Sequence, residues 1–340
     1  MKFLYRTLIL IGFAVIIISS CKQKSQKEVV KENIIEEKKE VPVSFNFHRY
    51  EMALFSLNPN KLSSELGQLI PEYRFFLGDQ WSDAAKQRTL YNYLIDKDIK
   101  EIYNEVKSLH PDLSSTEKEL TAHFTILKAK YPEINVPKVF TYVSGLDIDM
   151  PVIYADTVIA IAIDDFLGPE NKVYKKAGIP RYKAARCSRN NLIPSVMYAV
   201  AGGLMQIDQS KLTLLDIMIS EGKALYVTDI TLPETPDYLK IGYTEDQLNW
   251  CNANEGNIWA LLIENKLLYS ADREKTGKFF LDGPNTQGLS EQSPGRIASY
   301  MGWQIVKKYM ENQKDVTIKQ LFENTDSQEI LSKSGYKPKK

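Results

Sequence analysis

Residues Ile193 to Thr228 read IPSVMYAVAGGLMQIDQSKLTLLDIMISEGKALYVT, and the rest of the chain is interpreted around them. The pattern predicts an apolar helix, a polar break and a second helix that carries Glu221. A helix that binds a metal needs ligands at i and i+4, which share one face. The first predicted helix has no His, Glu, Asp or Cys between Leu192 and Ile207. This stretch therefore predicts a pair of helices without a metal site.

The layout resembles the zinc helix and glutamate helix of gluzincin metallopeptidases, with the HExxH motif missing. In an active gluzincin, Glu221 would be the third zinc ligand, but a lone carboxylate cannot hold Zn²⁺. The only histidines are His48, His110 and His123, and no two of them are four residues apart. The resemblance implies a mostly helical α+β fold with a small β-sheet, on a degenerate gluzincin-like scaffold. It also implies no catalytic residue, no metal ligand and no cofactor.

Glu221, Tyr226 and Arg296 are the candidate residues of a vestigial or ligand-contacting site. Glu221 is interpreted first as a partly buried acid, paired with Arg296 or Arg186 or bonded to backbone. The alternative is a retained peptide-binding cleft in which Glu221 meets a ligand amine. Ser195 has no motif of a nucleophile around it.

Asp164 and Asp165 end a predicted strand, and they resemble a metal or acid–base pair. Adjacent strand residues point to opposite faces, however. The preferred interpretation is therefore a turn at the end of the strand with one local cap.

The N-terminus predicts a lipoprotein. Lys2 and Arg6 precede an apolar run, and Ile18-Ser19-Ser20-Cys21 fits a lipobox. We therefore expect residues 1–20 to be a signal peptide and Cys21 to be lipidated, which would anchor the chain stably in a membrane. Residues 21–44 are rich in both charges and predict a flexible tether. Lys22-Gln23-Lys24 after the cysteine favours an inner- or outer-membrane anchor that faces the periplasm.

Composition narrows the remaining possibilities. Lys+Arg and Asp+Glu are equal at 43 each, so nothing supports binding to nucleic acid. The domain is expected over 45–340, with a helical part at 45–135 and a sheet with helices at 136–340. Cys187 and Cys251 are interpreted as free buried thiols, with a disulfide as the alternative.

Periodicity and capping patterns predict the individual elements. Ser114 with Glu117 suggests a capping box, and Ser293-Pro294 suggests a helix start. Further helices are expected at 50–55, 59–70, 83–94, 97–109, 244–250, 255–268 and from 317, with strands at 138–143, 151–154 and 157–163.

Several segments resemble GldB, a lipoprotein family associated with gliding motility in Bacteroidetes. The segments are Ile161–Gly168, Gly178–Tyr182, Glu221–Tyr226, Ser293–Arg296, Met301–Val306 and Tyr336–Lys339. The order and spacing of these segments resemble those of the family over most of the chain. It implies an envelope role without enzymatic activity.

We therefore expect a non-catalytic, lipid-anchored component of gliding or cell-envelope machinery that binds a protein partner in the envelope. One alternative is a zinc-dependent metallopeptidase with a non-standard metal site. Another is a lipoprotein that binds peptidoglycan or another ligand.

Overall fold

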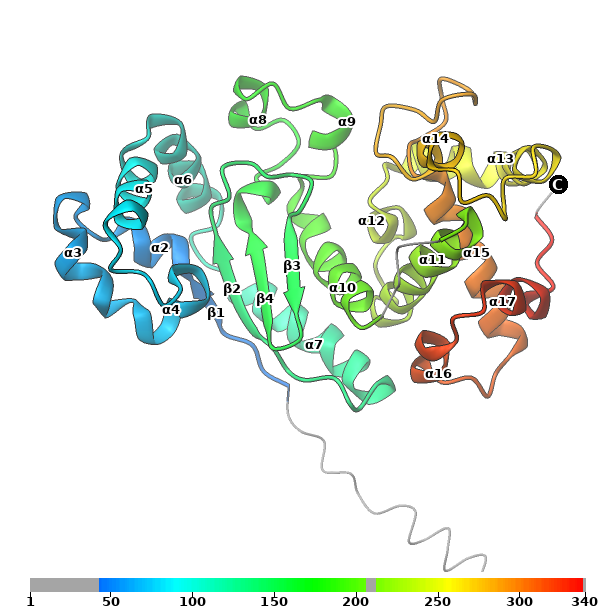
Figure 1. Ribbon diagram of the computed structural model, residues 1–340, viewed down its shortest axis with the longest axis horizontal. Coiled ribbons are helices and arrows are strands. Elements are labelled where there is room, and N and C mark those ends of the chain that lie inside the picture. The colour runs from blue at the N-terminus through cyan, green and yellow to red at the C-terminus, as the bar shows by residue number, and fades with distance from the viewer. Residues whose placement is uncertain (1–42, 206–211, 339–340) are drawn as a thin grey trace, which may run out of the picture. The chain divides into compact units, whose positions relative to one another are not determined.

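A computed structural model describes residues 43–205 and 212–338 (Figure 1). The predictions for the signal peptide, for Cys21 and for most of the tether lie outside the described residues. The described chain is mostly helical with one small sheet, and the predicted α+β class is confirmed.

The longer predicted helices and three predicted strands occur in the expected order. The helices are α2 (Tyr50–Phe55), α3 (Leu62–Glu65), α4 (Ile70–Leu77), α5 (Ala84–Ile95), α6 (Lys97–Leu109), α7 (Ser114–Lys130), α8 (Lys172–Lys176), α9 (Arg181–Ala184), α10 (Leu192–Gly203), α11 (Leu214–Thr231), α12 (Asp237–Ile241), α13 (Glu245–Glu264), α14 (Arg273–Thr276), α15 (Ile297–Asn312), α16 (Ile318–Glu323) and α17 (Ser327–Ser334). The strands are β1 (Phe47–Arg49), β2 (Lys138–Tyr142), β3 (Val152–Ala155) and β4 (Val158–Ala162). The structure adds β1 and the short helices α8, α9, α12, α14 and α17, which were not predicted.

The sheet has the strand order β1-β2-β4-β3. β1 pairs with β2 and β2 with β4 in parallel, whereas β3 and β4 form an antiparallel hairpin. Asp156 allows the tight connection because it adopts a positive φ of 46°. The three strands expected after residue 136 are confirmed. β1 was missed because three residues are too few to show an alternating pattern. The hairpin leaves β3 at an edge of the sheet, and α10 packs against it (Figure 1).

Helices α10, α11 and α15 pack next to one another and position the site described below. The closest approach is between α11 and α15, where two glycines meet. A Cβ on Gly222 would lie 2.2 Å from the carbonyl oxygen of Gly302, and one on Gly302 would lie 1.7 Å from that of Met218. Only glycine fits at either position, so these two residues set the spacing of the helices.

Apolar side chains form separate buried clusters. One joins the sheet to α7 and α10, and the other surrounds α11, α13 and α15. Cys187 belongs to the first cluster and Cys251 to the second, and both thiols are buried and free. The preferred interpretation of two free thiols agrees with the structure.

Two predicted helix caps are wrong because the capping side chains have other partners, although α7 does begin at Ser114. Ser114 bonds to Asp112, and the Glu117 carboxylate accepts the backbone N–H of Phe47 at 2.7 Å. Ser293 likewise donates to the carbonyl oxygen of Ser290, in the loop before the helix. α15 begins instead after Arg296, which adopts a left-handed conformation with φ 57°.

The lengths of two predicted helices also differ. The single helix expected over 59–70 is split into short α and 3-10 segments, and α4 begins at Ile70 with Pro71 in its first turn. The two helices expected within 244–268 are one helix, α13. Its polar middle does not break it, because Cys251, Glu255 and Ile258 keep one face buried.

Candidate functional site

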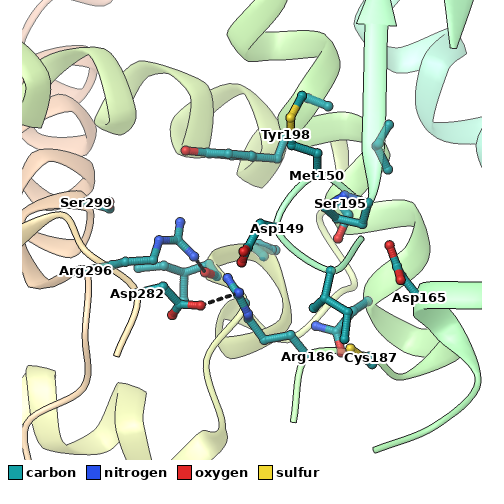
Figure 2. Close-up of a pocket in the computed structure, with 18 of the residues that line it drawn as sticks. Asp149, Met150, Asp165, Arg186, Cys187, Ser195, Tyr198, Asp282, Arg296 and Ser299 are labelled. Carbon is teal, nitrogen blue, oxygen red and sulfur yellow. Dashed lines mark hydrogen bonds and ion pairs between the residues drawn. The ribbon is translucent and has the colours of Figure 1, made fainter. Parts of the chain in front are cut away.

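A cavity of about 620 Å³ lies beside the edge strand β3. Its walls come from the β2–β3 loop and β3, the 3-10 turn after β4, α10, α11, α12 and the start of α15. Figure 2 shows Asp165 on the opposite side of this cavity from Arg296 and Asp282. The cavity therefore brings together side chains that are far apart in the sequence.

Glu221 on α11 is held from two neighbouring helices. The hydroxyl of Tyr198 on α10 donates to its Oε2 at 2.5 Å, and the hydroxyl of Ser299 on α15 donates to the same oxygen at 3.0 Å. Burial, followed by the charge of Glu221, raises the pKa of Tyr198 well above its ordinary value. Tyr198 therefore keeps its proton and remains a hydrogen-bond donor to the carboxylate.

Arg296 lies at the start of α15, near Glu221. Its Nη1 donates to the backbone carbonyl of Ile241 at 3.3 Å. Burial alone would lower the pKa of Arg296, but Tyr198, Glu221 and other acidic groups together have a larger, opposite effect. The net result is a raised pKa, so the guanidinium remains charged. Among the described residues Glu221 forms no ion pair with Arg296 or Arg186 and no hydrogen bond to backbone, so the expected partner is replaced by two hydroxyl donors, and the charge of Glu221 acts on Arg296 only through space.

Arg186 forms an ion pair with Asp282. Burial, and then the neighbouring charge of Arg296, lower the pKa of Arg186. Its Nε is buried and has no hydrogen-bond partner among the residues that the structure describes. Asp282 therefore neutralises the charge of Arg186 but leaves one donor unused.

Tyr226 does not line the cavity. It is half-buried and packs against both large apolar clusters, and burial raises the pKa of its phenol. Of the three candidate residues, the structure therefore brings Glu221 and Arg296 to one cavity and places Tyr226 elsewhere.

The adjacent carboxylates after β4 have different environments. Asp164 accepts the backbone N–H groups of Ser144, Gly145 and Leu146, so it caps a loop twenty residues away rather than its own turn. Asp165 lines the cavity with a side chain that is 1% exposed. Neither of its carboxyl oxygens has a hydrogen-bond partner within the described ranges. The sequence singled out Asp165 as one of two adjacent carboxylates, but its preferred interpretation as part of a turn did not place it at a binding site.

The cavity residues do not fit a zinc site. The face of α10 that meets Glu221 presents Tyr198, whose hydroxyl hydrogen points at the carboxylate. Within residues 43–205 and 212–338, no three His, Cys, Asp or Glu side chains gather closely enough to hold a metal ion. The three histidines lie outside the cavity. His110 and His123 contact the backbone carbonyls of Phe166 and Thr231, at 3.0 and 2.9 Å.

The fold and the site together define the class of this protein: an α+β domain with a polar cavity beside its central helices. A family model described as gliding motility protein GldB matches residues 31–338, which is nearly the whole chain. The chain therefore belongs to the GldB family of gliding-motility lipoproteins, and the resemblance found in the sequence is confirmed. No curated protein and no solved structure matches it. Among the described residues, no helix has both the length and the apolar character needed to span a membrane.

Proposed function

We propose that this protein is anchored by lipid at Cys21, faces the periplasm, and acts without catalysis as a binding component of gliding or related envelope machinery. Membership of the GldB family supports the envelope role. The cavity supports a binding role, because its size is within the usual range of about 300–1,000 Å³ for ligand sites.

The environment of Glu221 is the observation that supports a protein without catalytic activity. A zinc-bound glutamate directs its carboxylate at the metal, together with two or three further ligands. Here Tyr198 and Ser299 both donate to Glu221 Oε2, and α10 offers a phenol in place of histidine. The position of β3 beside the cavity supports a degenerate gluzincin-like scaffold, as part of the same proposal.

Metal content tests this proposal against a zinc-dependent peptidase with a non-standard site. The full chain is purified in detergent without chelator, alongside Glu221→Gln, and both are measured by elemental mass spectrometry. We expect background metal in both proteins. Zinc near one equivalent in the wild type and lost in Glu221→Gln would overturn the proposal.

Site-specific photo-crosslinking tests for an envelope partner. A photoreactive amino acid replaces Met150, which lines the cavity and is 57% exposed, or Ile263, which is 48% exposed and lies outside the cavity. We expect a discrete crosslinked envelope protein only from position 150. The same products from both positions, or none from position 150, would contradict a partner at the cavity.

A further inference from the structure

Unused hydrogen-bonding groups gather at the cavity. In the part of the chain that the structure describes, seven buried side-chain nitrogen or oxygen atoms have no hydrogen-bond partner. Three of the seven belong to residues on facing walls of this one cavity: both carboxyl oxygens of Asp165 and Arg186 Nε. A buried polar group without a partner costs about 1–3 kcal/mol. Their concentration at one cavity indicates that an occupant supplies the missing partners.

The charges on the cavity wall are already balanced. The guanidinium groups of Arg186 and Arg296 are matched by the carboxylates of Asp282 and Glu221. Asp149 forms an ion pair with Lys183, and Lys240, which also lines the cavity, forms ion pairs with Asp229 and Asp237. Asp165 adds no charge at neutral pH, because burial, followed by the charge of Asp164, raises its pKa to about 9. The cavity therefore does not require a charged ligand.

The unused groups define the complementary chemistry. A protonated carboxyl offers one O–H donor and one carbonyl acceptor. Arg186 Nε–H is a donor. The ligand must therefore carry at least two acceptors and one donor, without net charge. Amide groups meet these requirements.

We propose that the cavity binds an uncharged, amide-bearing ligand, with Asp165 in its protonated form accepting an amide N–H and donating to a carbonyl oxygen. In this arrangement Arg186 Nε donates to a further carbonyl oxygen of the ligand. Peptide backbone and N-acetylated sugars share this chemistry, and both can be small enough for the cavity of about 620 Å³. This proposal specifies the ligand of the proposed binding function. It rests on that function in one respect, namely that the cavity is a binding site.

Calorimetry on the full chain in detergent tests the ligand class. The probes are N-acetyl-trialanine amide, which has blocked ends, trialanine with free ends, and N-acetylglucosamine, with glucose as the control that lacks an amide. We expect the blocked peptide or N-acetylglucosamine to bind, and whichever binds identifies the source of the amide. Background heats for both would overturn the proposal.

Substitutions at Asp165 test its role. Asn keeps one donor and one acceptor, so Asp165→Asn should bind the amide probe within about threefold of the wild type. Leu has a similar size but no hydrogen-bonding group, so Asp165→Leu should weaken binding about tenfold or more. Leu suits a buried position, so this variant is expected to fold. The control Asp315→Asn changes an exposed carboxylate that does not line the cavity, and it should bind as the wild type does. Equal binding by the wild type and Asp165→Leu would overturn the role of Asp165.

The pH dependence separates an amide from a cation as the ligand. Asp165 interacts with Asp164, Asp147, Asp149, Tyr142, Tyr174 and Cys187, and Arg186 lies across the same cavity. Burial raises the pKa of Cys187 to about 12 and that of Tyr174 above its ordinary range, so neither titrates below pH 9. Affinity should stay constant from pH 6 to 8 and fall as Asp165 ionises near pH 9, whereas Asp165→Asn should show no such fall.

Tighter binding of trialanine with its free ammonium, increasing toward pH 8, would instead show a cation-binding carboxylate and overturn the amide assignment. Such a result leaves the proposed function standing. Metal content and crosslinking from position 150 test that function separately, so failure of the two proposals can be distinguished.

Discussion

The unpartnered carboxyl of Asp165 makes the stability of the fold depend on pH. An unfolded Asp titrates near 3.8, whereas burial and the neighbouring Asp164 raise the pKa of Asp165 in the folded protein to about 9. Between these values the folded state binds more protons than the unfolded state, so the contribution of Asp165 to the free energy of unfolding falls as pH rises from about 4 to about 9. Asp165→Asn should therefore stabilise the protein by roughly 1–3 kcal/mol at pH 7 and have little effect at pH 4.

Urea denaturation of both proteins at pH 4, 7 and 9 measures this difference. Asp315→Asn is the control, because Asp315 is exposed and is not among the groups that shift the pKa of Asp165. A stability difference between wild type and Asp165→Asn that does not grow between pH 4 and pH 7 would contradict a neutral Asp165.

The hydroxyl of Tyr198 donates one hydrogen bond, to Glu221, and a substitution can remove this donor. Tyr198→Phe keeps the ring and deletes the donor to Glu221, so the carboxylate keeps only the hydroxyl of Ser299. We expect a loss of about 1–3 kcal/mol in the free energy of unfolding, measured by urea denaturation. Tyr226→Phe, on the same pair of helices but outside the cavity, should change it by less than about 0.5 kcal/mol. Equal losses in the two variants would contradict the role of Tyr198.

The sequence could identify Glu221 and Arg296 as site residues but not Asp165. Glu221 stands in a recognisable pattern on an apolar helix. Asp164 and Asp165 are the same residue type side by side, and only the packing of distant loops gives one of them backbone donors and leaves the other without any.

The crossing of α11 and α15 depends on the absence of side chains at two positions. Gly302→Ala would place a Cβ 1.7 Å from the backbone carbonyl of Met218, so the helices must move apart. We expect a loss of about 1–3 kcal/mol or more, measured as a lower urea midpoint.

Gly202→Ala is the matched control for this crossing, since a Cβ there meets nothing within 4 Å and the residue lies in the last turn of α10. It should be neutral or stabilise by up to about 1 kcal/mol. Similar stability of Gly302→Ala and the wild type would contradict the close crossing.

Sequence periodicity predicted most helices and three of the strands because apolar spacing directly reflects which face is buried. It failed where one side chain has two possible partners. Glu117 could have completed a local capping box, but it accepts the N–H of Phe47 from a segment seventy residues away. A pattern in one segment cannot show that competing donor.

At the scale of the whole molecule, the proposed lipid anchor at Cys21 can be tested directly. We expect the wild-type chain to incorporate labelled palmitate in cells and to fractionate with membranes. Cys21→Ser should lose both properties, because no acyl chain can then be attached through sulfur. Cys251→Ser, at a buried thiol of the domain, should keep both. Palmitate labelling that persists in Cys21→Ser would contradict the proposed anchor.

The fold class could be predicted from sequence, whereas the assembly of the cavity could not. Asp165, Arg186, Glu221 and Arg296 come from four separate segments. These residues come together only because of the way α10, α11 and α15 pack. Helix periodicity predicts which face of each helix is buried, but it does not predict which other helix packs against that face.

The position of β1 has a mechanical consequence for a protein of motility machinery. β1 is an edge strand near the first described residue, and it pairs in parallel with β2. Any tension applied to the chain before Val43 must enter the domain through this strand. A pull along β1 strains its hydrogen bonds to β2 together, in shear, whereas a pull across the sheet breaks them one after another. The force that this domain withstands should therefore depend on the direction in which it is pulled.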